Sequence, residues 1–471
     1  MYYFAREQGV AKLVVSTIVW LGVACLGCGS SMSPSGLPGG GEGGAPGEPV
    51  TVSFLRHDST TYRTADNEFF ADYMAIHPEV TIADTTVDFR TLMSMLLSDL
   101  RSDHFSFDLV LIPPARVCSF ARFLADVPPE VISLTDAQNT FFKAPLEGST
   151  CGGVLKALPV EYNLEYGGVV VNLDKFHAKF GDRAPGWATW DAFIADASAL
   201  TEYDATGLPM ANGLDIDPRW SAPTRHLLLS QIIQRGGEYL TKDGLFDFMT
   251  PQAHDSLAAM VDWVKRGKVM FRSLVPDRNT DVTTRLAHGA TGYGWSDPAR
   301  PLSVMGYLGT WGIPATVDML PASVQWHYDY VALPPMVGTE HRFVQDSGWA
   351  FAVPRTSPHA KVAWDIARSL TLSLAAMRKW SATTGALPAL RANGAASAVA
   401  THPSLGKIQP LLDRGKWMGY VPAEAIDTVF GAIVSNFFAA ASDGPDAKTV
   451  DVALRDMQET VNAAMITYRG Q

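Results

Sequence analysis

The chain has 471 residues, of which 47% are hydrophobic and 18% are charged, and its net charge at pH 7 is -11. This length and composition suit a globular protein of two or more domains. The acidic balance, without a basic cluster, argues against a nucleic-acid partner.

The amino terminus is typical of an export signal. Arg6 and Lys12 precede an apolar run, residues 13–26, that is too short for a confident membrane span. Small residues around Cys28 resemble a lipoprotein cleavage site, which predicts a signal peptide over residues 1–28 and a lipid on Cys28. Cys25 as the lipidated residue and a plain secretory signal are the alternatives. Residues 29–49 are rich in Gly, Ser and Pro and are expected to form a flexible tether.

Residues 50–112 have a β-α-β-α-β pattern. Apolar residues alternate over 50–54 and at Val80 and Ile82, recur at helical spacing over 69–74 and 92–100, and form a continuous run over 109–112 after Asp108. This order predicts an open α/β sheet, in which ligands bind beyond the carboxyl ends of the strands. His57 and Asp58 lie at the first such end, so they are candidate ligand residues. The alternative is that they form a solvated loop.

The stretch from Cys151 to Leu200 organises the middle of the chain. Residues 154–158 are expected to form a short strand ended by Pro159, followed by a crossing segment over 160–163 and a buried strand over 169–171. Thr189 is expected to cap the next helix.

Three segments of this stretch resemble the extracellular solute-binding proteins of ABC importers, in particular the maltose-binding-like group. They are Leu-Pro-Val-Glu-Tyr-Asn at 158–163, Val-Val-Asn-Leu-Asp-Lys at 170–175 and Thr-Trp-Asp-Ala-Phe at 189–193. Further similar segments lie at 264–268, 328–335 and 385–389. The resemblance implies an α/β, two-lobed periplasmic-binding-protein-like fold of type II, with open sheets flanked by helices and a hinge of crossing strands. The implied lobes are 50–160 plus 331–385 and 161–330 plus 386–471.

The resemblance also implies a function without chemistry. The protein would bind a sugar or oligosaccharide between the lobes and deliver it to an ABC permease with its ATPase. It would be a monomer held at the periplasmic or outer face of the cell membrane by its lipid alone. Neither a cofactor nor a catalytic residue is expected, and the body of the chain has no metal-binding spacing such as H-E-x-x-H.

Sugar recognition needs aromatic side chains against C–H faces and carboxylates or amides against hydroxyl groups. Glu161 matches the family's ligand-binding acid, although the segment around it could instead satisfy its own polar groups within a hinge. Val170 and Val171 stand where many members have tyrosines, so one aromatic platform is absent. The candidate ligand-binding residues are His57, Asp58, Glu161, Tyr162, Asn163, Tyr293, Trp295, Asp346 and Trp349.

Two cysteines remain outside the leader, Cys118 and Cys151. Export permits a disulfide between them, and two unpaired buried thiols are the alternative. Two other functions stay open. One is a secreted hydrolase that uses Glu161 and Asp346 as paired carboxylates. The other is a binding protein for a non-sugar solute such as a polyol phosphate or a peptide, for which Arg56 or another arginine would matter more than the tryptophans.

Overall fold

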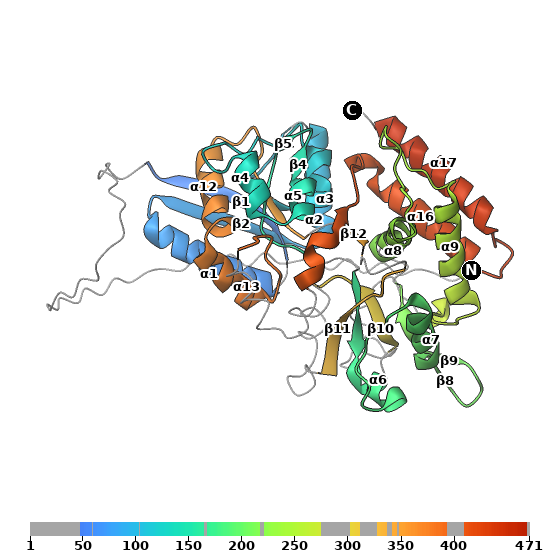
Figure 1. Ribbon diagram of the computed structural model, residues 1–471. Coiled ribbons are helices and arrows are strands. Elements are labelled where there is room, and N and C mark those ends of the chain that lie inside the picture. Colours follow the sequence, from blue (N-terminus) through green and yellow to red (C-terminus); the bar gives the residue numbers. More distant parts are fainter. Residues whose placement is uncertain are drawn as a thin grey trace, which may run out of the picture. The chain divides into compact units, whose positions relative to one another are not determined.

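The alternating residues at the start of the chain form the first sheet of the computed structural model (Figure 1). Its strands run in the order β2-β1-β3-β13-β6. β1, β2 and β3 are mutually parallel, and β13 is antiparallel to both β3 and β6. The strands are β1 (Val50–His57), β2 (Val80–Val87), β3 (Leu109–Ile112), β6 (Leu158–Pro159) and β13 (Ala350–Ala352). The predicted β-α-β-α-β opening is therefore confirmed.

The structure describes residues 48–58, 60–102, 104–163, 167–216, 221–274, 302–310, 327–336, 342–345, 348–392 and 409–468. All of them belong to one compact unit, Glu48–Gln471.

Strand alternation divides the side chains of the first sheet between two cores. Phe54 and Phe351 point into a core with α1, α12 and α13, whereas Leu55 and Val110 point into a core with α2 and α3. Figure 1 shows α1, α12 and α13 beside this sheet. These helices are α1 (Thr60–Ile76), α2 (Phe89–Ser102), α3 (Pro114–Val117), α12 (Ala360–Thr371) and α13 (Leu374–Thr384).

The second sheet has the strand order β11-β7-β10-β9-β8. The predicted apolar run 169–171 lies in β7, between β11 and β10, and all three of its residues are fully buried. The strands are β7 (Gly168–Asn172), β8 (Glu202–Tyr203), β9 (Pro209–Asp215), β10 (Ser303–Leu308) and β11 (Tyr328–Ala332).

A third core lies between this sheet and the helices that pack on it, including the two C-terminal helices. Thr189 and Thr250 cap α7 and α9 by accepting backbone hydrogen bonds, as predicted for Thr189. The C-terminal helices α16 and α17 pack on each other and on α8 and α9. The helices are α6 (Leu173–Phe180), α7 (Trp190–Leu200), α8 (Ser221–Gln234), α9 (Pro251–Lys265), α16 (Ile426–Ala440) and α17 (Val450–Tyr468).

The strand predicted over 154–158 is wrong in one respect, because the structure divides it. β5 (Val154–Leu155) pairs with β4 (Thr150–Cys151) in a hairpin, while β6 joins the first sheet. The hairpin turn uses Gly152 and Gly153, both at positive φ. Between the two strands, the amine of Lys156 turns away to Asp126, 2.6 Å from the carboxylate. Two helices precede this hairpin, α4 (Leu134–Thr140) and α5 (Lys143–Ser149).

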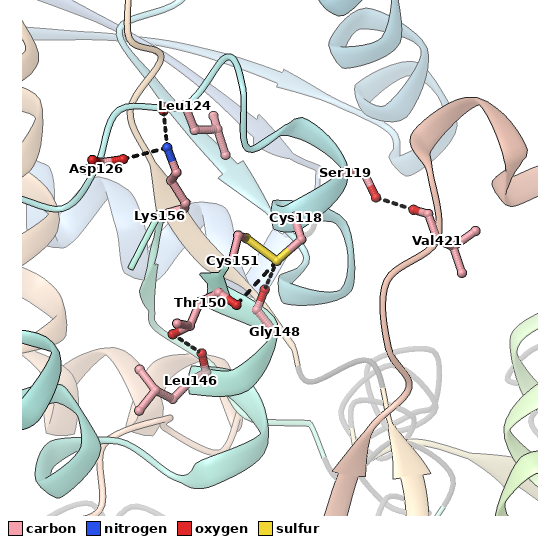
Figure 2. The surroundings of a disulfide bond; sticks show 10 residues. All are labelled: Cys118, Ser119, Leu124, Asp126, Leu146, Gly148, Thr150, Cys151, Lys156 and Val421. Atoms are coloured by element: carbon pink, nitrogen blue, oxygen red, sulfur yellow. Dashed lines mark hydrogen bonds and ion pairs between the residues drawn. A yellow bond between two sulfur atoms is a disulfide. The ribbon is translucent and has the colours of Figure 1, made fainter. Parts of the chain in front are cut away.

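Cys118 and Cys151 are joined by a disulfide bond, with their Cα atoms 5.3 Å apart. Figure 2 shows that this bond ties the turn after α3 to the β4–β5 hairpin. The neighbouring Ser119 hydroxyl donates to the carbonyl of Val421, just before α16. The disulfide thus braces a point where the first-sheet region contacts the C-terminal helices.

Among the described residues, the stretch Ala423–Ala440 alone has the length and composition of a membrane span, and 61% of it is buried inside the protein. It packs as a core helix against α8 and α17.

Candidate functional site

Several predicted residues meet at one edge of the first sheet. β1 ends at His57, and the register sets Ala350 of β13 opposite Ile112 of β3 and Pro159 of β6. The carboxyl ends of β1, β3 and β6 therefore share an edge with the amino end of β13. Trp349 precedes β13 and Glu161 follows β6, so both lie at that edge.

An aromatic cluster covers this edge. The rings of His57 and Trp349 stack with centroids 5.3 Å apart and planes 16° apart. Phe89, at the start of α2, meets each of them at a steep angle, with ring centroids 6.1 Å away. Burial lowers the pKa of His57, against the opposing charges of Asp58 and Asp88. A neutral imidazole therefore supports the indole of Trp349.

Glu161 lies beside this cluster and is fully buried. Its backbone N–H and that of Val160 donate to the carbonyl of Trp349, at 3.2 and 2.9 Å. The hydroxyl of Tyr62, on α1, donates to Oε1, whereas Oε2 has no hydrogen-bond partner among the described residues. Burial raises the pKa of Glu161 to about 8, and the charge of Asp66 adds to this, against opposing interactions with Tyr62 and Asn163.

A buried polar network lies behind Glu161. The guanidinium of Arg56 is ion-paired with Asp66 at 3.0 Å and with Asp84 at 2.6 Å. The indole N–H of Trp380 donates to Asp66 at 2.7 Å, and its ring packs on that of Tyr62, 5.4 Å away. Burial raises the pKa of Asp66 against the effects of Trp380 and Arg56. This network fixes the position of Tyr62, and Arg56 is itself committed to protein groups.

Tyr162 points away from the aromatic cluster into the core. Its hydroxyl donates to the carbonyl of Leu412 and accepts a 2.6 Å hydrogen bond from Gln345. Gln345 belongs to β12 (Phe343–Gln345), which pairs with β14 (Gly415–Trp417). Three chain segments that are far apart in sequence are therefore held together by one buried hydroxyl. A ligand contact for Tyr162 stays a prediction.

The crossing segment also reaches the second sheet. The side chain of Asn163 accepts a 3.3 Å hydrogen bond from Thr310, which follows β10. The carbonyl of Gly167 accepts a 3.0 Å hydrogen bond from Leu333, which follows β11. The candidate site therefore lies where the chain passes from one sheet to the other.

The other predicted residues contribute less to this arrangement. Asp58 is 48% exposed and ion-paired with Arg63 at 3.3 Å. Tyr293, Trp295, Asp346 and Cys28 lie outside the described residues. Within the described part of the chain, no group of three His, Cys, Asp or Glu side chains could hold a metal ion.

Two residues of the site, Tyr62 and Phe89, were not predicted from the sequence. Phe89 directly follows β2 and Asp88, so the rule about carboxyl ends of strands would have found it. Tyr62 carries no local signal, because its partner lies 99 residues further along the chain.

Comparison with known proteins identifies the architecture. The family model described as "Bacterial extracellular solute-binding protein" matches residues 68–406. This chain belongs to the family of bacterial extracellular solute-binding proteins. The family description gives the protein an extracytoplasmic location. Among curated protein sequences, none matches at a significant level.

Solved structures of other solute-binding proteins share the fold. The cyclic alpha-maltosyl-1,6-maltose binding protein from Arthrobacter globiformis is 21% identical and has a TM-score of 0.68, over 89% of this chain and 100% of that one. The ABC substrate-binding protein from Listeria monocytogenes in complex with cycloalternan has a TM-score of 0.70 at 15% identity, over 88% and 98%. The sugar-binding protein MalE from Xanthomonas citri has a TM-score of 0.69 at 14% identity, over 89% and 98%.

These matches establish an α/β fold of the two-lobed, MalE-like type, as predicted. The family is described by solute binding, and the three neighbours are described as binding proteins, so the comparisons favour a binding protein over the hydrolase alternative.

Proposed function

We propose that this solute-binding protein is the lipid-anchored receptor of an ABC importer and captures an uncharged sugar or oligosaccharide between two lobes. One observation carries the proposal. The backbone carbonyl of Trp349, whose ring is stacked, accepts a hydrogen bond from the backbone N–H of Glu161. The Oε2 atom of Glu161 has no hydrogen-bond partner among the described residues. An aromatic face beside an available carboxyl oxygen is the combination that a sugar ring requires.

The charges around the site favour an uncharged solute over an anionic one. Asp58 and Asp66 are acidic, Glu161 is buried without a cation beside it, and the arginines Arg56 and Arg63 are each ion-paired with aspartates. A phosphate at this site would lie near acidic groups, and both arginines are already ion-paired with aspartates and so are not available to bind it. Arg56 therefore gives no support to the alternative of a phosphorylated solute. Structural neighbours crystallised with maltose, mannotriose and alpha-D-tagatose agree with a sugar ligand.

Capture requires movement, because Glu161 is fully buried in the structure described here. We assign residues 50–160 and 331–385 to one lobe, and 161–330 and 386–471 to the other. The connections between them run beside each other. The backbone N–H of Tyr162 donates to the carbonyl of Leu387, and β12, the strand of Gln345, pairs with β14. Such connections can flex while both cores stay packed, so a solute would shift the population from open to closed forms.

The anchor and the partner complete the proposal. Cys28 would carry the lipid, and the Gly-rich tether over residues 29–49 would give the body a root-mean-square reach of roughly 25 Å from the membrane. The closed, loaded form would then be handed as a monomer to the membrane permease and its ATPase. Cys28→Ser should release the protein from the membrane fraction, and metabolic labelling with a fatty acid should mark the wild type alone.

A binding screen tests the central part. The purified protein is heated with maltose, maltotriose, mannotriose, alpha-D-tagatose or inorganic phosphate, because a ligand that binds only the folded state raises the melting temperature. A rise with at least one sugar and none with phosphate supports the proposal. No rise with any of the sugars, or a rise with phosphate alone, would overturn it.

A further inference from the structure

The carboxyl group of Glu161 occupies an unusual environment for an acid. Its side chain is fully buried. Oε1 accepts a hydrogen bond from Tyr62, but Oε2 has no partner among the described residues. The side chain of Asn163 also favours the charged form. An ionised carboxylate needs several donors, and among the described residues only the Tyr62 hydroxyl and the Asn163 side chain favour the charge.

The charged groups that face Glu161 do not compensate for ionisation. On α1, Asp66 adds negative charge, and Tyr62 offers its hydroxyl as a hydrogen-bond donor. On β1, Arg56 is held by two aspartates, and His57 is kept neutral by burial. A buried carboxylate loses its hydration, and without a nearby cation no ion pair compensates for this loss. The group is therefore more stable in its protonated, neutral form.

Tyr62 determines which oxygen holds that proton. Because the tyrosine hydroxyl donates to Oε1, that oxygen acts as an acceptor. The proton of a neutral Glu161 then resides on Oε2, the atom that lacks a partner. A buried O–H donor without an acceptor is costly, and it becomes satisfied when a ligand oxygen arrives.

We propose that Glu161 of the ligand-free protein is protonated on Oε2 at neutral pH and recognises the solute as a hydrogen-bond donor, with Tyr62 as the residue that positions the proton. The identity of the solute in this inference rests on the proposed function. The position of the proton on Oε2 rests on the geometry alone. It names the chemistry of recognition: an uncharged oxygen with a free lone pair, such as a hydroxyl, ring or glycosidic oxygen.

The direction of the Glu161 pKa agrees with this geometry. With a pKa of about 8, the donor is present at pH 7 and one tenth present at pH 9. Affinity for a solute that accepts its proton should therefore fall about tenfold between pH 7 and pH 9. The Glu161→Gln variant retains a donor at the same position and should show no such fall.

The first experiment needs no solute. Infrared difference spectra between the wild type and Glu161→Gln, taken from pH 5 to pH 10, separate protonated from ionised carboxyl groups. We expect a protonated carboxyl band at pH 7 that disappears with a midpoint near pH 8. Because Tyr62 favours the charged form, Tyr62→Phe should move this midpoint upward, which a purely structural role would not do. Glu130→Gln removes an exposed carboxyl group and should leave the band unchanged.

The second experiment titrates maltotriose calorimetrically into the wild type and Glu161→Gln at pH 7 and pH 9. Absence of the protonated band at pH 7 would overturn the inference. A band together with pH-independent maltotriose affinity in the wild type would overturn the donor role. A band without binding of any sugar in the screen, maltotriose included, would overturn the proposed function and the donor role, while the protonation would stand.

Discussion

Glu161→Gln should stabilise the protein at neutral and alkaline pH. The pKa of Glu161 is about 8 in the folded protein and 4.5 in its ordinary state. The folded state therefore holds more protons than the unfolded state between these values, and the stability of the wild type falls as pH rises through this window. Below pH 4.5 the group is protonated in both states and contributes no difference.

The magnitude follows from the width of the window. At about 1.4 kcal/mol for each pH unit, and with a slope that flattens near pH 8, the wild type should lose up to about 3.5 kcal/mol between pH 5 and pH 8 through this one group. Water entry and local relaxation reduce that figure, so it is an upper limit. Glutamine has the shape and hydrogen-bonding capacity of the neutral acid without its titration, so Glu161→Gln should lack this loss. The corresponding difference in melting temperature is at most about 4 °C at pH 8.

Thermal and urea unfolding of both proteins, followed by tryptophan fluorescence at pH 5, 6, 7 and 8, measure this difference. Glu130→Gln is the matched control, because its carboxyl group is exposed. The stability curves of the wild type and Glu161→Gln should separate as pH rises. Parallel curves would refute the reasoning, since they would mean that Glu161 titrates alike in the folded and unfolded states.

Three further predictions follow from other parts of the site and its frame. Trp349→Ala should weaken sugar binding at least tenfold in calorimetry through loss of the aromatic face; unchanged affinity would remove Trp349 from the site. Gly348→Ala should destabilise the protein by about 1–3 kcal/mol in urea unfolding, because φ is +76° and a Cβ would lie 2.5 Å from a carbonyl oxygen of the crossing segment. Gly431→Ala, on an open helix surface, should cost nothing, and equal losses in both variants would count against this account. The paired change Cys118→Ala and Cys151→Ala should cost about 3–4 kcal/mol by releasing a crosslink between residues 33 apart in the unfolded chain; wild-type stability that is insensitive to reduction would contradict it.

The sequence revealed the first sheet because its signal is local. Val52, Phe54 and the run 109–112 alternate or cluster as buried strands do, and the edge that carries His57 follows from the parallel order. The sequence also located the residues of the crossing segment, 160–163. It did not predict where their side chains point, because their orientations depend on distant partners. Tyr162 follows Glu161 directly, yet its hydroxyl is held by residues 183 and 250 positions away.

The divided strand over 154–158 shows the same limit. Its residues are apolar enough for one strand, but Val154 finds a partner in a local hairpin and Leu158 in the main sheet. Hydrophobic pattern identifies a strand and not its neighbour. Likewise, nothing near Tyr62 in sequence indicates the carboxyl group that it contacts.

Calorimetric titration of the wild type with maltose, maltotriose, mannotriose and alpha-D-tagatose tests the account most directly, if the sugar is analysed afterwards for products. We expect one of these sugars to bind one molecule per protein chain and to be recovered intact, with binding weakened in Trp349→Ala. Failure of all four to bind, or recovery of a cleaved product, would contradict the account of this protein as a sugar receptor.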